Sequence, residues 1–209
     1  MSFADVWQSL LGDFLRSINE EKVPPLSGYV ADYVQRGCEV EPDDYRLMAL
    51  TPSTLQLVAT SSNCLTDCMF ELQSKFKHFV PDDWGGHMEK GRRDLGVIGF
   101  NILEGPVLDI LEINKTGGYL DWAEPKLDAL HWERLLIRAV VDYGRSCGAK
   151  QIRLQPAHAC PLGNEAAADP AQRAILQEEL KQRYDANATA MGFQFDENLD
   201  RFVYEPAAA

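Results

Sequence analysis

Positive charge is scarce in this sequence relative to negative charge. The chain of 209 residues contains 20 Lys and Arg against 32 Asp and Glu, which gives a formal net charge of -12 at pH 7. Such a surface repels a phosphate backbone, and the basic residues do not cluster into a stripe that would offset the repulsion. The composition argues against nucleic acid and anionic membranes as partners and leaves a small molecule as the expected partner.

Long apolar runs are also absent. No window approaches the roughly 20 consecutive apolar residues that a membrane-spanning helix needs. The N-terminus lacks a basic region followed by an uninterrupted apolar segment, which a secretory signal would show. We therefore expect a cytoplasmic protein with no membrane partner.

Cysteine is sparse and odd in number, with five residues in the chain. This count argues against a disulfide scaffold and for reduced thiols. A zinc site would require Cys64 and Cys68 to meet His158 and Cys160. Neither pair has the C-x-x-C spacing typical of such sites, so we predict no metal site.

Several enzyme signatures are missing as well. The sequence contains no Gly-x-Ser-x-Gly, HExxH, Walker or dinucleotide-binding pattern. What it does contain is 45% hydrophobic residues in a chain long enough to bury roughly 70% of its unfolded surface. We expect a folded domain with a full core.

Residues 1–40 are predicted to form a helical extension. Apolar residues recur at helical spacing from Phe3 to Ile18, so one broad face of this helix must be buried. Packing against the rest of the chain is the favoured interpretation, and a contact in a homodimer is the alternative. Residues 41–209 then form the main α+β domain.

The next segment combines a clear strand with an ambiguity. Residues 45–50 are predicted to be a strand, whereas residues 51–60 fit either a helix begun by Pro52 or a hairpin through it. The apolar spacing of residues 65–79 predicts an amphipathic helix. A long polar loop over residues 81–93 follows.

Three strands in quick succession are predicted to form an antiparallel meander, because the loops between them are short. In the middle strand Leu108 and Ile110 are expected on one face, and Leu111 and Ile113 on the other. A strand that is apolar on both faces indicates helices on both sides of the sheet. The three strands are residues 95–102, 107–114 and 118–123.

The C-terminal half alternates helices and strands. Residues 132–147 carry a long apolar helical stripe that ends at Gly148. Residues 150–155 are predicted to be a strand parallel to the one before it, because a helical crossover joins the two. A final helix with apolar positions over residues 175–191 and a hairpin over residues 193–204 complete the chain.

This order of elements is similar to that of the GNAT superfamily of N-acyltransferases. The resemblance covers about residues 44–205. Its best local match is a helix that leads through Gly192-Phe193 to an acidic turn and a last strand, residues 201–204. The resemblance implies an α+β fold with a GNAT-like mixed, mostly antiparallel sheet and helices on both faces.

The resemblance also implies a cofactor, acetyl-CoA or another acyl-CoA. In the family, acyl-CoA lies in a V-shaped opening between the fourth and fifth strands, and its pantetheine pairs with the exposed backbone of the fourth. By position these strands are residues 118–123 and 150–155, and the pyrophosphate loop falls at the start of the long helix. The residues implied in cofactor binding are Trp122, Ala123, Leu130, His131 and Trp132.

The pyrophosphate loop departs from the family pattern Arg/Gln-x-x-Gly-x-Gly/Ala. Asp128 replaces the Arg or Gln, and His131 and Glu133 replace the glycines. Carboxylates repel a diphosphate, and bulky side chains hold it away from the backbone N–H groups. Asp128 is better interpreted as the N-cap of the helix.

Two residues are candidates for catalysis. Many family members use a carboxylate on the central strands as a base, and a Tyr four residues before the Gly-Phe step as an acid. Ala188 occupies that Tyr position, and Tyr184, one turn earlier, is a displaced substitute with packing as its alternative role. Of the two carboxylates in the middle strand, Asp109 and Glu112, Glu112 is the candidate base. A structural, hydrogen-bonded carboxylate is the alternative.

The implied activity is acyl-CoA-dependent N-acyl transfer to a small amine, and the acidic surface favours a cationic or neutral acceptor. One alternative is a non-catalytic GNAT-like protein that binds a small ligand in the same cleft. Another is a homo-oligomeric interaction module. The residues of the Asp128–Glu133 loop favour these alternatives over acyl transfer.

Overall fold

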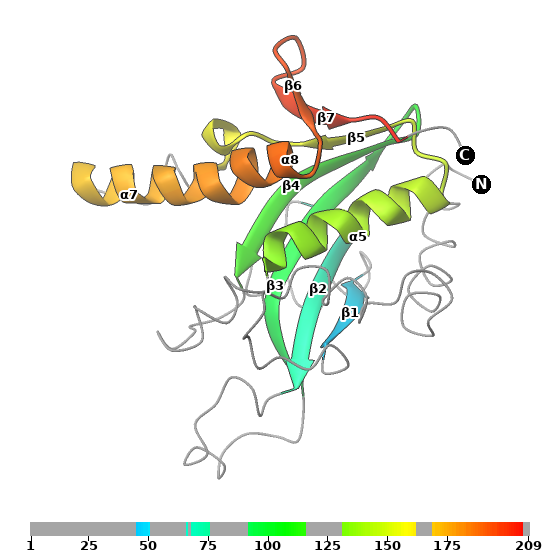
Figure 1. Cartoon of the computed structure of the whole chain (residues 1–209), viewed down its shortest axis with the longest axis horizontal. Helices are drawn as coiled ribbons and strands as arrows, with labels where there is room; N and C mark the ends of the chain where they lie inside the picture. Colours follow the sequence, from blue (N-terminus) through cyan, green and yellow to red (C-terminus); the bar gives the residue numbers. More distant parts are fainter. Residues whose placement is uncertain are drawn as a thin grey trace.

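A computed structural model describes residues 45–50, 66, 68–75, 92–115, 131–161 and 169–206. These residues form an α+β domain with one sheet (Figure 1). The predictions for residues 1–40, 51–60 and 118–123 lie outside the described residues. The elements are β1 (Tyr45–Leu50), β2 (Cys68–Lys75), β3 (Arg92–Leu103), β4 (Val107–Lys115), α5 (Trp132–Ser146), β5 (Gln151–Leu154), η4 (Ala157–Ala159), α7 (Pro170–Lys181), η5 (Gln182–Ala186), α8 (Asn187–Ala190), β6 (Gln194–Asp196) and β7 (Arg201–Tyr204).

The described strands form one sheet in the order β1-β2-β3-β4-β5-β7-β6. Neighbouring strands are antiparallel except β4 and β5, which are parallel and are joined by a connection that contains α5. The predicted parallel strand over residues 150–155 is therefore confirmed. Its parallel neighbour is β4 rather than residues 118–123, because the first four residues of β4 are all buried, as a central strand requires.

The prediction of a helix over residues 65–79 is wrong, because Cys68–Lys75 is a strand between β1 and β3. Its buried residue Phe70 lies edge-on to Phe100, with ring centroids 5.1 Å apart. The apolar residues of this segment are spaced as in a helix, but that preference is local. Pairing of the segment with a strand on each side stabilises it as a strand instead. The predicted loop over residues 81–93 is also too long, since β3 begins at Arg92.

A β-bulge interrupts the pairing of β3 with β4. Phe100 pairs with Ile110, but its neighbour Gly99 pairs with Glu112. Leu111 is therefore an extra residue in β4, and the faces to which its side chains point change at this position.

The bulge determines what each face of β4 carries. Ile113 points to the same face as Leu108 and Ile110, and all three are fully buried. The prediction that Ile113 faces the opposite side is wrong, because a strict alternation does not allow for the extra residue. Asp109 and Glu112 both face that opposite side.

Helix α5 packs on the face of the sheet that carries Phe70 and Phe100, and α7 and α8 lie beside it on the same side (Figure 1). The expected helices on the opposite face lie outside the described residues. No helix of the described ranges combines the length and apolar character that crossing a bilayer requires. The largest fully buried side chains of the core are Trp132, Tyr143, Tyr184, Phe70, Phe100 and Ile98.

Of the two predictions for the ends of α5, the one for the C-terminal end is confirmed and the one for the N-terminal end is wrong. Gly148 has φ +74°, a left-handed conformation that suits a glycine after a helix, as predicted. The helix begins at Trp132 with His131 at the N-cap position, so the prediction of Asp128 as N-cap is wrong. His131 itself has φ 48° and makes no side-chain cap bond.

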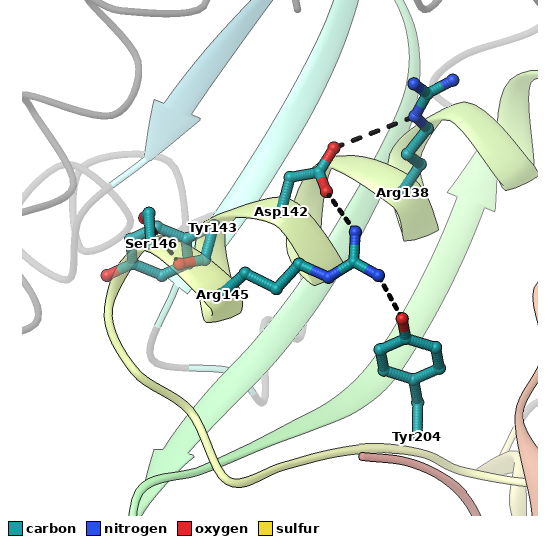
Figure 2. Close-up of polar contacts among 6 residues, drawn as sticks. All are labelled: Arg138, Asp142, Tyr143, Arg145, Ser146 and Tyr204. Atoms are coloured by element: carbon teal, nitrogen blue, oxygen red, sulfur yellow. Dashed lines mark hydrogen bonds and ion pairs between the residues drawn. The ribbon is translucent and has the colours of Figure 1, made fainter. Parts of the chain in front are cut away.

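A polar clamp connects α5 to the last strand, β7 (Figure 2). Asp142 lies 3.1 Å from Arg145 Nη1 and 3.8 Å from Arg138 Nε. Arg145 also donates to the Tyr204 hydroxyl, and its guanidinium lies 5.5 Å from the centroid of that ring. The C-terminal hairpin is thereby held against the helix.

The last helix is continuous from α7 through η5 to α8. Asp169 caps its start by accepting from the Ala171 N–H at 3.0 Å. Leu180 and Ala188 are buried as predicted, whereas Ile175, expected on the same apolar stripe, is 63% exposed.

Gly96 gives a direct test of this packing. A Cβ atom at residue 96 would overlap the six-membered ring of Trp132. We expect Gly96→Ala to lower the free energy of unfolding by about 1–3 kcal/mol through overpacking, measured by denaturant titration. In a Trp132→Leu background, which removes the ring, the same substitution should cost less. Equal costs in both backgrounds would contradict the described contact.

Candidate functional site

A fork lies where β4 and β5 separate. The two strands pair over only four residues each, Val107–Ile110 with Gln151–Leu154. The last backbone bond runs from the Gln155 N–H to the Ile110 carbonyl, at 2.9 Å. Beyond it β4 continues to Lys115 along β3, while the chain after β5 turns away (Figure 1).

Side chains fill the hydrogen-bonding positions that β5 leaves vacant in the fork. The Gln155 side-chain amide donates to the Leu111 carbonyl. The Ile113 N–H donates to the Tyr184 hydroxyl oxygen at 3.0 Å. Side chains rather than a neighbouring strand therefore satisfy the backbone of β4 on this side.

The bulge at Leu111 is what presents these two backbone groups to the fork. An extra residue in a strand reverses the directions in which the later backbone groups point. The Leu111 carbonyl and the Ile113 N–H therefore point toward the β5 side of β4. Without the extra residue, the same positions would point toward β3.

Tyr184 reaches the fork from η5, a turn of π-helix in the middle of the last helix. Turns of this kind are rare and are often found at functional sites. The side chain is only 1% exposed. The carboxylate of Asp185 accepts from the Ala157 N–H at 2.8 Å, which fixes η5 against η4.

The surroundings of Tyr184 keep its hydroxyl protonated. Burial raises the pKa of Tyr184 above its usual value of 10.0, and the nearby Cys160 thiol raises it further. Hydrogen bonds from the Ile113 N–H and the Gln155 side chain oppose the rise of this pKa without cancelling it. Cys160 Sγ lies 3.9 Å from the hydroxyl oxygen. At neutral pH Tyr184 is therefore a neutral phenol, which can both donate and accept hydrogen bonds.

A groove of about 740 Å³ lies beside the fork, between the start of α5 and the last helix. Lys115 is two residues beyond Ile113 along β4, and Arg183 precedes Tyr184, so the groove lies next to the fork. Its lining carries both signs of charge. The charged residues that line it are Lys115, Arg134, Arg183, Glu133, Glu178 and Glu179.

Asn187 links the helices that border this groove. Arg134 Nε donates to Asn187 Oδ1 at 2.9 Å, which connects α5 to α8. Asn187 Nδ2 donates to the Arg183 carbonyl at 3.1 Å. Asn187 is buried, so both helices are held by a polar side chain under the groove.

The two strand carboxylates occupy the face of β4 opposite α5. Asp109 lies 3.3 Å from Arg201 Nε. Burial raises the pKa of Asp109, and the charges of Arg201 and Arg153 lower it only in part. Glu112 is half-buried and accepts from Asn114 Nδ2 at 2.6 Å.

The predicted site residues that the structure describes do not all lie at the fork and the groove. Tyr184 lies in the fork and His131 lines the groove. Trp132 is fully buried against Gly96 and supports the helix start. Glu112 is next to the bulge but on the other face. The remaining predicted residues, Trp122, Ala123 and Leu130, lie outside the described residues.

Sequence reasoning missed the contributions of Gln155, Arg134 and Arg183. The sequence contains no signal for Gln155, because residues 150–155 are all predicted as strand and the pairing with β4 ends at Leu154. Two members of the zinc set considered from the sequence have other partners, since His158 Nε2 lies 2.8 Å from Asp200 and Cys160 contacts Tyr184. Among the described residues no group of three metal-ligating side chains is close enough to bind an ion.

Comparisons with known proteins add little to this site. No family model and no curated protein matches the chain. The chain is similar to a crystallised domain from Methanocaldococcus jannaschii DSM 2661 at 12% identity and a TM-score of 0.34, over 99% of this chain and 94% of that one. A likeness this weak carries no argument about fold or function.

The buried Asp109 gives a pH-dependent prediction. Because its pKa is raised in the folded state, the stability that it contributes is fully present below about pH 3.8 and is lost as the pH rises through the folded value. Asp109→Asn keeps this side chain neutral. The melting temperature of the variant should therefore rise relative to that of the natural protein as the pH is raised from 3.5 to 7.

The control for this series is Glu197→Gln, which neutralises an exposed carboxylate in the turn between β6 and β7. The difference in melting temperature between this variant and the natural protein should stay constant over the same pH range. A constant difference for Asp109→Asn as well would show that burial of Asp109 does not favour its neutral form.

Proposed function

We propose that this protein is a GNAT-like N-acyltransferase that moves an acyl group from acyl-CoA to a small amine. The observation that carries the proposal is the fork between β4 and β5, where a buried, protonated Tyr184 hydroxyl meets the backbone N–H of Ile113. An N–H group and a proton donor at one point are what a thioester needs when its C–S bond breaks.

The arrangement of the strands supports the proposal. The helical crossover from β4 to the parallel β5, the last helix and the closing hairpin match the second half of the order on which the resemblance rests, whereas β2 lies where the sequence predicts a helix. With β4 in fourth place, pantetheine would pair with the backbone of Leu111–Lys115 instead of residues 118–123. That stretch of β4 has no β5 residue beside it.

The groove gives the cofactor a path to the fork. Lys115, Arg134 and Arg183 line it and are suited to bind phosphate groups. A cofactor lying along the groove would have its thioester at Ile113. Its carbonyl oxygen would then accept from the N–H that now donates to Tyr184, and the Tyr184 hydroxyl would turn toward sulfur.

The reaction balances with Tyr184 in the fork and Glu112 beside the bulge, on the other face of β4. The amine nitrogen attacks the thioester carbonyl, a C–N bond forms and the C–S bond breaks. The departing thiolate takes the Tyr184 hydroxyl proton, and the proton of the attacking amine passes to Glu112 from the opposite face of β4. Proton exchange with solvent then restores both side chains.

A second candidate function is favoured by the acidic lining of the groove. Glu133, Glu178 and Glu179 would repel a diphosphate. A GNAT-like protein without transferase activity, which binds a small cationic or zwitterionic ligand in this groove, would tolerate them.

Binding of CoA separates the two functions. At about 100 times its dissociation constant, acetyl-CoA should stabilise the protein by roughly 2.7 kcal/mol and raise the melting temperature by several degrees. We expect Arg183→Ala to reduce this shift, because it removes a cation from the groove. The measurement is thermal unfolding with acetyl-CoA and with CoA.

Lys150→Ala, an exposed residue in the turn between α5 and β5, is the matched control and should keep the full shift. The absence of a shift with any CoA ester would overturn the transferase proposal. A shift with small amines alone would favour the second candidate.

A further inference from the structure

Gln155 occupies the apex of the fork and is only 5% exposed. Its backbone N–H makes the last bond between β4 and β5, to the Ile110 carbonyl. Its side chain then extends past this point into the fork. A buried amide in this position must use its hydrogen-bonding groups or weaken the fold.

The side-chain amide of Gln155 contacts the bulge that shapes the fork. It donates to the carbonyl of Leu111, the bulged residue of β4. A side-chain hydrogen bond with Gln155 is also among the influences that lower the pKa of Tyr184. The geometric contact that defines the role of Gln155 is the one to the Leu111 carbonyl, two residues before Ile113.

Two hydrogen bonds restrict the direction of the Tyr184 hydroxyl hydrogen. The phenol oxygen accepts from the Ile113 N–H at 3.0 Å and from the Cys160 thiol, whose Sγ lies 3.9 Å away. The hydroxyl hydrogen must therefore point in the one direction around the oxygen that these donors do not occupy.

We propose that Gln155 is a positioning residue, which fixes the bulge at Leu111 and thereby holds the Ile113 N–H on the Tyr184 hydroxyl oxygen in the fork. This inference rests on the proposed function for its consequence, the delivery of a proton to the leaving thiolate. The hydrogen-bond geometry itself does not depend on that function.

Two near-isosteric substitutions remove different parts of this role. Gln155→Met keeps the length of the side chain but removes both donors. Gln155→Glu keeps the shape and offers only acceptors when ionised, so it repels the Leu111 carbonyl. We therefore expect Gln155→Glu to speed hydrogen exchange at Ile113 and to lower turnover more than Gln155→Met does.

The test is a double-mutant cycle of Gln155→Met with Tyr184→Phe, read by hydrogen exchange at the Ile113 amide and by turnover. Either single variant should speed exchange at Ile113, and the double variant should add little to Tyr184→Phe alone. Turnover should fall about tenfold or more in kcat for Gln155→Met, with a smaller change in KM. That loss should vanish in the Tyr184→Phe background.

Gln151→Met is the matched control, because Gln151 begins β5, the strand that Gln155 follows, and accepts from Arg153 Nε at 2.6 Å on the face away from α5. It should leave exchange at Ile113 unchanged. Additive effects of Gln155→Met and Tyr184→Phe on exchange would overturn the positioning role. Non-additive exchange together with no CoA binding would uphold the role of Gln155 and overturn the proposed function.

Discussion

The early end of the parallel pairing between β4 and β5 is the constraint on which the rest of the structure depends. A longer β5 would satisfy the backbone of β4 along its whole length and leave no polar group for a ligand. Because β5 stops at Leu154, the Leu111 carbonyl and the Ile113 N–H require other partners. Gln155 and Tyr184 supply them, and both come from segments that the strand ending brings into position.

The same constraint explains why a bulge and a π turn occur close together. The bulge at Leu111 directs backbone groups of β4 into the fork. The π turn brings the Tyr184 hydroxyl to meet them, one turn before Ala188. Each irregularity is unfavourable alone, and buried hydrogen bonds between them stabilise both. The clamp from Arg145 to Tyr204 holds the hairpin that adjoins β5 (Figure 2).

The sequence predicts the regular elements of the second half well, because long apolar periods and Gly148 mark them. It fails where tertiary pairing overrides a local period, as in β2, and where one extra residue changes the faces of a strand, as at Leu111. Tyr184 could be found from its distance to Gly192-Phe193. Gln155 could not, because its role depends on a strand ending that only the paired structure shows.

The carboxylates of Glu133, Glu178 and Glu179 in the groove repel a diphosphate, so the decisive measurement is whether CoA binds, and where. A titration of isotopically labelled protein with CoA, followed by backbone amide chemical shifts, measures it directly. The account predicts the largest shifts at Ile113 and along the groove from Lys115 to Arg183. Shifts centred instead on the hollow of about 660 Å³ beside β6 and β7, or none at all, would contradict it.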